Sequence, residues 1–169
     1  SAGGFRGRKG SYYEGGFRVP CLVRWPGKIA PGSISDRVTG FEDWLPTLLE
    51  LIGDRANTPA SIDGISFAPT LRGEKQPPRP FLYRESPGYG GQQCVRVGDW
   101  KAIQTKLNPN KSVANVTKTV MELYDLASDP GETSNVAGQH PDLVASLGAI
   151  MKQHHVKSDL FPIRALDGN

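Results

Sequence analysis

The feature that most constrains the fold is an alternation of apolar and polar residues, with a period of two, in the second half of the chain. It recurs in four short runs, at residues 81–85, 94–97, 100–103 and 121–125. Gly98 and Asp99 separate the second run from the third and form a two-residue hairpin signal, with glycine at the first central position. The pattern predicts four antiparallel strands, with a long polar hairpin loop over residues 108–119.

One amphipathic helix is expected after these strands, beginning near Pro141. Its apolar residues share one face: Leu143, Val144, Leu147, Ile150 and Met151. Such a helix must bury its apolar stripe against a face of the sheet. Residues 80–165 are therefore predicted to form a small α+β subdomain, a four-stranded antiparallel sheet with one packed helix.

The first part of the chain predicts a different layer. Residues 19–25 are nearly all apolar, which is typical of a strand buried on both faces of a helix-covered sheet. A helix is expected over residues 43–52, with Asp43 as its cap. Its buried stripe would hold Leu45, Leu48, Leu49 and Ile52. The connection rich in Gly and Pro at 54–80 marks a boundary, so residues 1–75 are predicted to be the end of an α/β domain.

Composition limits the partners of the chain. It has 169 residues, and 20 Lys and Arg against 17 Asp and Glu give a net charge of +3. The apolar runs are far shorter than the roughly 20 residues that cross a bilayer, and no basic stripe typical of nucleic-acid binding is visible. We expect neither a membrane nor a nucleic acid as partner. Cys21 and Cys94 are expected to be buried free thiols, although one disulfide would also be compatible.

The candidate functional residues lie in a basic, glycine-rich opening at residues 7–20, which reads GRKGSYYEGGFRVP. Glycines on either side of cationic side chains allow the backbone to approach a small anion, and Lys9 supplies a compact point charge. A tetrahedral oxyanion such as sulfate or phosphate suits this arrangement. Composition alone favours a simpler interpretation, a solvated basic turn.

The order of the residues changes that balance. Residues 6–9 (RGRK), 13–20 (YEGGFRVP) and 24–29 (RWPGKI) resemble the second signature region of the sulfatase family, in the alkaline-phosphatase-like superfamily. The helix start at 43–48, the hairpin at 95–101 and the segment 122–135 look like later landmarks, in the order of the family. The resemblance covers nearly the whole chain. It implies the C-terminal portion of a sulfatase, in which residues 1–75 are the α/β tail of the catalytic domain.

This resemblance implies roles for single residues. Lys9 matches the family lysine that contacts the sulfate group, so it is the candidate catalytic and substrate-binding residue. Glu14 and Arg18 match signature positions that are expected to support the turn holding Lys9. Substrate contacts are also expected from a polar loop that can reach the pocket rim in this family. The candidates there are Tyr89, Gln92 and Gln93.

The chain also departs from the family pattern. Sulfatases use a formylglycine, made from Cys or Ser in a Cys/Ser-x-Pro-x-Arg motif, beside a divalent cation that is usually calcium. Neither Cys21 nor Cys94 stands in such a motif, and no carboxylate cluster could supply the roughly six to eight oxygens of a calcium site. No metal site is predicted within this chain. The nucleophile and the metal ligands are expected in a missing N-terminal catalytic portion, and the chain alone is expected to be inactive.

Two alternatives stay open at this point: a non-catalytic sulfatase-like binding module, and a phosphoesterase relative in the same superfamily. The substrate would be a sulfated small molecule or glycan, whose identity these residues do not define. The resemblance suggests a periplasmic, secreted or lysosomal location. The strand near Val23 would lack its neighbours, so its exposed edge could pair with a second copy.

Overall fold

The computed structural model describes residues 2–108 and 120–168 of the chain. The chain divides into two compact units. One, here called the sheet unit, joins the start of the chain up to Val19 to everything from Tyr83 onward. The other, here called the helical unit, holds Pro20–Leu82.

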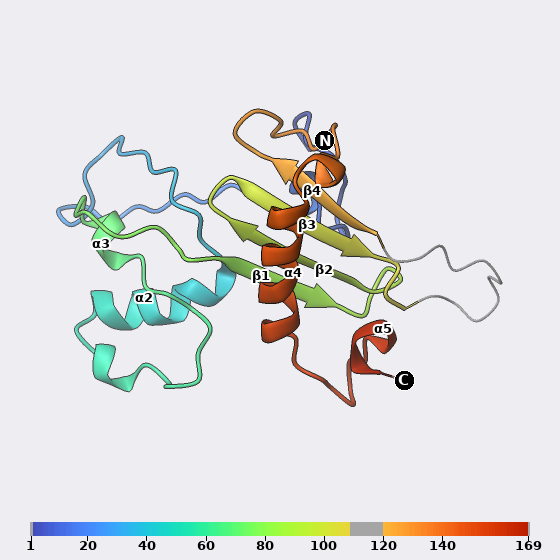
Figure 1. Cartoon of the computed structure of the whole chain (residues 1–169). Coiled ribbons are helices and arrows are strands. Elements are labelled where there is room, and N and C mark those ends of the chain that lie inside the picture. Colours follow the sequence, from blue (N-terminus) through green and yellow to red (C-terminus); the bar gives the residue numbers. More distant parts are fainter. Residues whose placement is uncertain (1, 109–119, 169) are drawn as a thin grey trace. The chain divides into compact units, whose positions relative to one another are not determined.

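The sheet unit is built on four strands that lie in the order β1-β2-β3-β4 (Figure 1). They are β1 (Leu82–Ser86), β2 (Gln92–Val97), β3 (Trp100–Thr105) and β4 (Met121–Asp125). β2 pairs antiparallel with β3, and β3 pairs antiparallel with β4. Gly98 has a φ of 56°, the left-handed conformation that a tight hairpin turn requires and that glycine adopts readily. The predicted four-stranded antiparallel sheet is confirmed. Most of the predicted loop at 108–119 lies outside the described residues.

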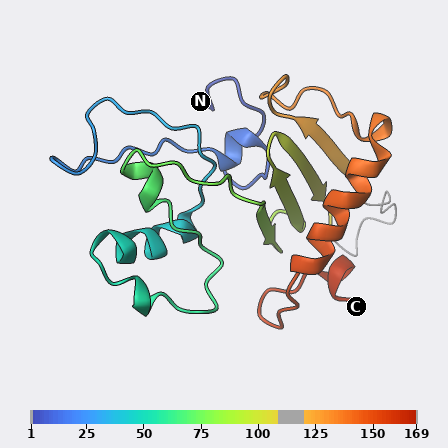
Figure 2. The ribbon, with the colours of Figure 1, turned by 60° about the vertical axis from the view of Figure 1, so that its left-hand side comes forward.

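Each face of this sheet is covered by a different segment (Figure 2). The helix α4 (Pro141–His154) contacts β2 and β3 and buries Leu147 and Met151, so the predicted packed helix is also confirmed. The opening segment, residues 5–18, covers the other face. Its aromatic side chains pack against a cluster around Cys94, Ile103 and Tyr124. After α4 the chain ends with α5 (Arg164–Asp167), and the short η3 (Ala137–Gln139) precedes α4.

The helical unit is organised around α2 (Trp44–Leu51), the helix predicted over 43–52. Three shorter elements accompany it: η1 (Phe41–Asp43), η2 (Arg55–Asn57) and α3 (Ala68–Leu71). Asp43 makes no capping bond to α2. Its buried carboxylate instead accepts hydrogen bonds from the backbone N–H groups of Gly40 and Ile65 and pairs with Arg79 at 2.6 Å. The residue predicted as a helix cap is thus the polar centre of this unit.

The strand predicted over residues 19–25 is wrong. The described backbone there is neither helix nor strand, and Leu22 is 96% exposed. A strand of this kind forms only when neighbouring strands supply hydrogen-bond partners, and no segment in the described ranges pairs with this one. The strand edge expected near Val23 is therefore absent as well. Cys21 is exposed and Cys94 is buried, and both are free, so the expectation of two buried thiols holds only for Cys94.

The apolar stripe expected to be buried on α2 is largely exposed. Leu45, Leu48 and Ile52 are 49%, 51% and 69% exposed, and Leu49, the fourth residue of the stripe, is partly buried. Pro46 and Thr47 are the buried residues of the helix. The helix therefore packs on its unit through a different side from the one that its leucines define. Leu45, Leu48 and Ile52 are spaced to lie on one side of α2, and no other part of the helical unit covers them. They form an apolar surface that another part of a protein could cover.

Residues 1–19 group with the sheet unit rather than with residues 20–75. Compact units of one chain are not the same as the domains of a family, so the division into 1–75 and 80–165 stays a prediction. None of the helices in the described ranges has the length and apolar character needed to cross a membrane.

Candidate functional site

Two glycines let the loop that carries Lys9 lie directly on a helix. The helix α1 (Glu14–Phe17) is a single turn, and residues 5–11 wrap around it. The N–H of Gly15 donates to the carbonyl of Arg6 at 2.7 Å. A Cβ atom on Gly15 would lie 2.6 Å from that same oxygen, and one on Gly16 would overlap the carbonyl oxygen of Arg8. Only glycine leaves room for this close approach.

Lys9 is exposed at the tip of this loop. Gly7 and Gly10 flank it with φ values of 85° and 94°, left-handed conformations that turn the backbone sharply on both sides. Within residues 2–108 and 120–168 the Lys9 ammonium makes no hydrogen bond or ion pair. The loop therefore presents a positive charge that no described side chain neutralises.

Two of the predicted substrate-binding residues lie beside this loop. A Cβ on Gly10 would overlap the ring of Tyr89, so the ring lies against the backbone next to Lys9. The Gln92 amide donates to the carbonyl of Gly10 at 2.8 Å and accepts from the N–H of Tyr12 at 3.3 Å. Gln92 is thereby buried and fully engaged, whereas the Tyr89 ring is largely exposed.

Gln93 is not part of this group. Because side chains alternate along a strand, Gln93 and Gln92 point to opposite faces of β2. The Gln93 amide donates to Gln104 and accepts from the hydroxyl of Tyr83. It is buried on the face that α4 covers, away from the Lys9 loop. Of the residues expected to contact a substrate, the structure thus brings together Lys9, Tyr89 and Gln92.

Glu14 and Arg18, the two expected supports, do not pair with each other. The Glu14 carboxylate is buried and accepts a hydrogen bond from the Lys101 ammonium at 2.7 Å. The Arg18 guanidinium lies over the ring of Phe5, 4.9 Å from its centroid. Glu14 therefore bonds to the sheet beneath the opening segment, and Arg18 contacts a ring within that segment. The direct pair that their four-residue spacing suggested does not form.

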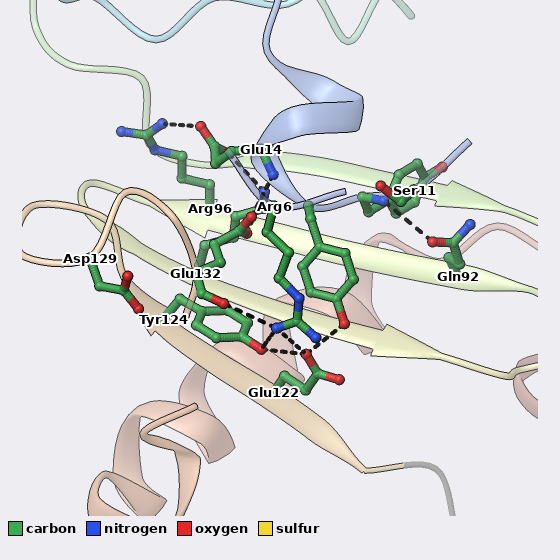
Figure 3. Close-up of polar contacts among 12 residues, drawn as sticks. Arg6, Ser11, Glu14, Gln92, Arg96, Glu122, Tyr124, Asp129 and Glu132 are labelled. Atoms are coloured by element: carbon green, nitrogen blue, oxygen red, sulfur yellow. Dashed lines mark hydrogen bonds and ion pairs between the residues drawn. The ribbon is translucent and has the colours of Figure 1, made fainter. Parts of the chain in front are cut away.

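A buried charge cluster under α1 was not predicted. Lys101 is 1% exposed, and its Nζ lies 2.7 Å from Glu14 Oε1 and 3.0 Å from Glu132 Oε1. Glu132 is fully buried, and its Oε2 accepts a hydrogen bond from the backbone N–H of Glu14. Burial raises the pKa of Glu132, and the nearby ammonium only partly offsets this. Arg96 adds a second cation, 3.9 Å from Glu14 (Figure 3).

Arg6 anchors the other end of the loop (Figure 3). Its Nη1 donates to the hydroxyl of Tyr124 at 2.6 Å and to the carbonyl of Glu132 at 3.0 Å, and its guanidinium stacks 3.9 Å from the ring of Tyr13. The Tyr13 hydroxyl donates to Glu122 at 2.7 Å. Burial, together with the Glu122 carboxylate, raises the pKa of Tyr13 to about 12, so this hydroxyl stays protonated and remains a donor.

Lys101 and Glu132 were not among the predicted site residues, but the sequence pattern indicates that Lys101 is buried. Lys101 shares the alternation of β3 with Ile103, a core residue, and a lysine on a core face requires an acidic partner. Glu132 carried no local signal of burial. It lies in the connection after β4 with a φ of 54°, a left-handed conformation that is uncommon for a residue with a side chain.

The described residues do not fit a metal site. Across residues 2–108 and 120–168, no group of three or more His, Cys, Asp or Glu side chains could hold a metal ion. The calcium that the resemblance implies therefore has no ligand set in this part of the chain.

Comparisons with known proteins identify relatives along most of the chain. Residues 5–157 match the family model described as N-sulphoglucosamine sulphohydrolase, C-terminal. The chain is 32% identical to the steryl-sulfatase of Mus musculus over 184 residues, which cover 93% of this chain and 29% of that protein. It is 37% identical to the arylsulfatase A of Homo sapiens over 158 residues, which cover 82% of this chain and 31% of that protein. The chain thus spans less than a third of the length of these relatives.

Solved structures agree with these relationships. One, described under the metabolism of multiple glycosaminoglycans by Bacteroides thetaiotaomicron, matches with a TM-score of 0.68 and 29% identity. The match covers 89% of this chain and 32% of that one. A 2-O GAG sulfatase matches with a TM-score of 0.53 and 34% identity, over 66% of this chain and 23% of that one.

Proposed function

Because this chain belongs to the sulfatase family and corresponds to its C-terminal region, we propose that it works as part of a sulfuric ester hydrolase in which Lys9 contacts the sulfate group. One observation carries the proposal. The Lys9 ammonium is exposed and has no partner among the described residues. Its loop lies directly against α1, where Gly15 and Gly16 leave room for the backbone of the loop. An exposed ammonium without a partner in the described part of the chain is suited to an anionic substrate.

The contribution of Lys9 to the reaction would be electrostatic. Hydrolysis of a sulfate ester divides it into an alcohol and inorganic sulfate, and negative charge redistributes over the oxygens as the ester bond breaks. An ammonium already in place beside those oxygens stabilises this charge without further reorganisation. The nucleophile and the metal, formylglycine and calcium in the family, are proposed to come from residues outside this chain, so the chain alone is proposed to be inactive.

Tyr89 is proposed to contact the part of the substrate that is not sulfate. Its ring is exposed and lies against the loop of Lys9, where it could pack on a sugar or on another ring system. Gln92 supports this rim through its bonds to the loop backbone. Gln93 is buried on the opposite face of β2 and has no part in the proposed contact. The proposed substrate is a sulfated small molecule or glycan.

The exposed stripe of α2 indicates a partner for this chain. Since the chain spans 29% and 31% of two curated relatives, we propose that the remaining catalytic portion of a sulfatase covers Leu45, Leu48 and Ile52. Burial of a leucine or isoleucine side chain contributes about 1.5–3 kcal/mol, which is sufficient for such a stripe to hold two parts of one protein together.

The test is a charge deletion in the full-length protein. Lys9→Ala should lower kcat/KM for a chromogenic aryl sulfate about 10²–10³-fold, the loss seen when one group that stabilises transition-state charge is removed. Lys28→Ala is the matched control, because Lys28 is also an exposed lysine and has no proposed role. An unchanged kcat/KM in Lys9→Ala would refute the assignment.

The same assay separates the two alternatives. A phosphoesterase would hydrolyse the matching aryl phosphate faster than the aryl sulfate. A binding module would retain a sulfated ligand in a Lys9-dependent manner but release no product. The match to a sulfatase family model and to several sulfatases favours the sulfate ester.

A further inference from the structure

The geometry points to Glu132 as the positioning residue of the Lys9 loop, an inference that rests on the role proposed for Lys9. Glu132 lies in the connection between β4 and α4, far along the chain from the opening segment. Among the described residues, no hydrogen bond or ion pair joins Glu132 to Lys9, Tyr89 or Gln92. Its effect on the reaction would be exerted entirely through the loop.

Glu132 binds both ends of that loop. Its Oε2 accepts the backbone N–H of Glu14 at 2.5 Å, and its carbonyl oxygen accepts Arg6 Nη1 at 3.0 Å (Figure 3). Arg6 precedes Lys9 by three residues, and Glu14 follows it by five. A single residue thus closes the chain around Lys9 into a loop with two fixed ends.

The second Glu132 oxygen ties this closure to the sheet. Oε1 lies 3.0 Å from the ammonium of Lys101, which also binds the Glu14 side chain at 2.7 Å. Lys101 belongs to β3 and is 1% exposed, so its position is fixed by the core. The loop is therefore attached to a rigid strand. A site that must hold a charge in place needs such support.

The Glu132 side chain is not needed to form its own turn. Asp129 already closes that turn, because its Oδ2 accepts the N–H groups of Thr133 at 2.8 Å and Ser134 at 2.9 Å. The φ of Glu132 is 54°, a conformation that glycine would adopt more readily. The Glu132 carboxylate instead bonds to Glu14 in α1 and to Lys101 in β3. The opening segment is therefore the part of the structure that depends on this carboxylate.

The inference predicts coupling between Glu132 and Lys9 in the full-length enzyme. Glu132→Gln keeps the length and shape of the side chain and removes its charge, and Glu132→Gly suits the backbone and removes the carboxylate. Each should lower kcat for an aryl sulfate on the order of 10- to 100-fold, the loss expected from a misplaced catalytic group, with a smaller change in KM. In a Lys9→Ala background the same substitutions should change kcat less than about twofold, because a positioning residue has no effect once the group it positions is gone.

Several outcomes would overturn the inference. Equal losses in both backgrounds would show that Glu132 only supports the fold, and unchanged kcat in both Glu132 variants would show that the loop does not need it. Thermal unfolding, measured in parallel, identifies a loss of folded protein. Asp125→Asn is the control, because this carboxylate lies at the end of β4, next to the same connection, and its hydrogen bonds in the described part of the chain come from the N–H of Ala127 and the hydroxyl of Ser128. It should keep wild-type activity. If Lys9→Ala alone keeps full activity, the proposed function fails instead, and this inference fails with it.

Discussion

At the scale of single residues, the opening segment depends on charges that are removed from water. Glu14, Lys101 and Glu132 are all nearly or fully buried, and each is costly to bury alone. The arrangement is tolerable because the ammonium lies within 3.0 Å of both carboxylates and because a backbone N–H also satisfies Glu132. Removing one member should leave an uncompensated charge in the interior.

Lys101→Met should therefore destabilise the sheet unit strongly. The substitution keeps an unbranched side chain but leaves two buried carboxylates without their shared cation, and a broken buried pair costs about 3–5 kcal/mol. The free energy of unfolding in urea is the measurement. Lys152→Met on the exposed side of α4 serves as control and should change it by less than about 0.5 kcal/mol. A loss below about 1 kcal/mol for Lys101→Met would contradict the account.

At the scale of elements, the C-terminal segment is attached to the sheet by a histidine between two carboxylates. His155 Nδ1 lies 2.6 Å from Glu85 Oε2 of β1, and Nε2 lies 3.1 Å from Asp167 Oδ1 of α5. Both ring nitrogens face acceptors, so the imidazolium, which donates from both, is the form that fits. Partial burial lowers the pKa of His155, but the bonds and charges of the two carboxylates outweigh this and raise it.

This attachment predicts a pH dependence. Because the pKa of His155 is higher in the folded protein than in the unfolded chain, its stabilisation is fully present below the unfolded value of about 6.5 and is lost as pH rises through the folded value. The difference in free energy of unfolding between wild type and His155→Gln should therefore be larger at pH 5.5 than at pH 8.5. A difference that is constant or grows with pH would contradict the role of the imidazolium.

The helix α2 offers a second test at this scale. Leu48→Ala should cost less than about 1 kcal/mol in this chain, because Leu48 is already half exposed, but about 2–3 kcal/mol in the full-length protein, where the stripe is proposed to be covered. Urea unfolding of both proteins gives the two values. Leu147→Ala on α4 is the matched control and should be costly in both, since Leu147 is buried within this chain. Equal, small losses for Leu48→Ala in both proteins would exclude a partner at α2.

At the scale of the whole molecule, the sequence predicted correctly those elements that local patterns determine, the four-stranded sheet and the helix packed on it. The alternation with period two and the turn at Gly98 specify the sheet, and the period of α4 matches the face that it buries. The strand at 19–25 and the buried stripe of α2 failed for a common reason: each pattern describes burial against a neighbour, and that neighbour is absent from the unit in which the segment lies.

The candidate site divides in a similar way. The Lys9 loop could be identified from its residue order, because the glycines and the lysine lie close together along the chain. Its support could not, since Glu132 is separated from Glu14 by 118 residues and meets it only through the fold. Long-range pairing of this kind leaves at most a weak trace in one sequence, such as a lysine placed on the core face of β3.

The most direct measurement is a crystal structure of the full-length protein with a sulfate ester or inorganic sulfate in its active site. The account predicts that Lys9 Nζ lies within about 2.7–3.2 Å of a sulfate oxygen, that the ring of Tyr89 faces the remainder of the ligand, and that Glu132 still binds Arg6 and Glu14. A sulfate group bound without Lys9, with that amine directed into solvent, would contradict the central claim.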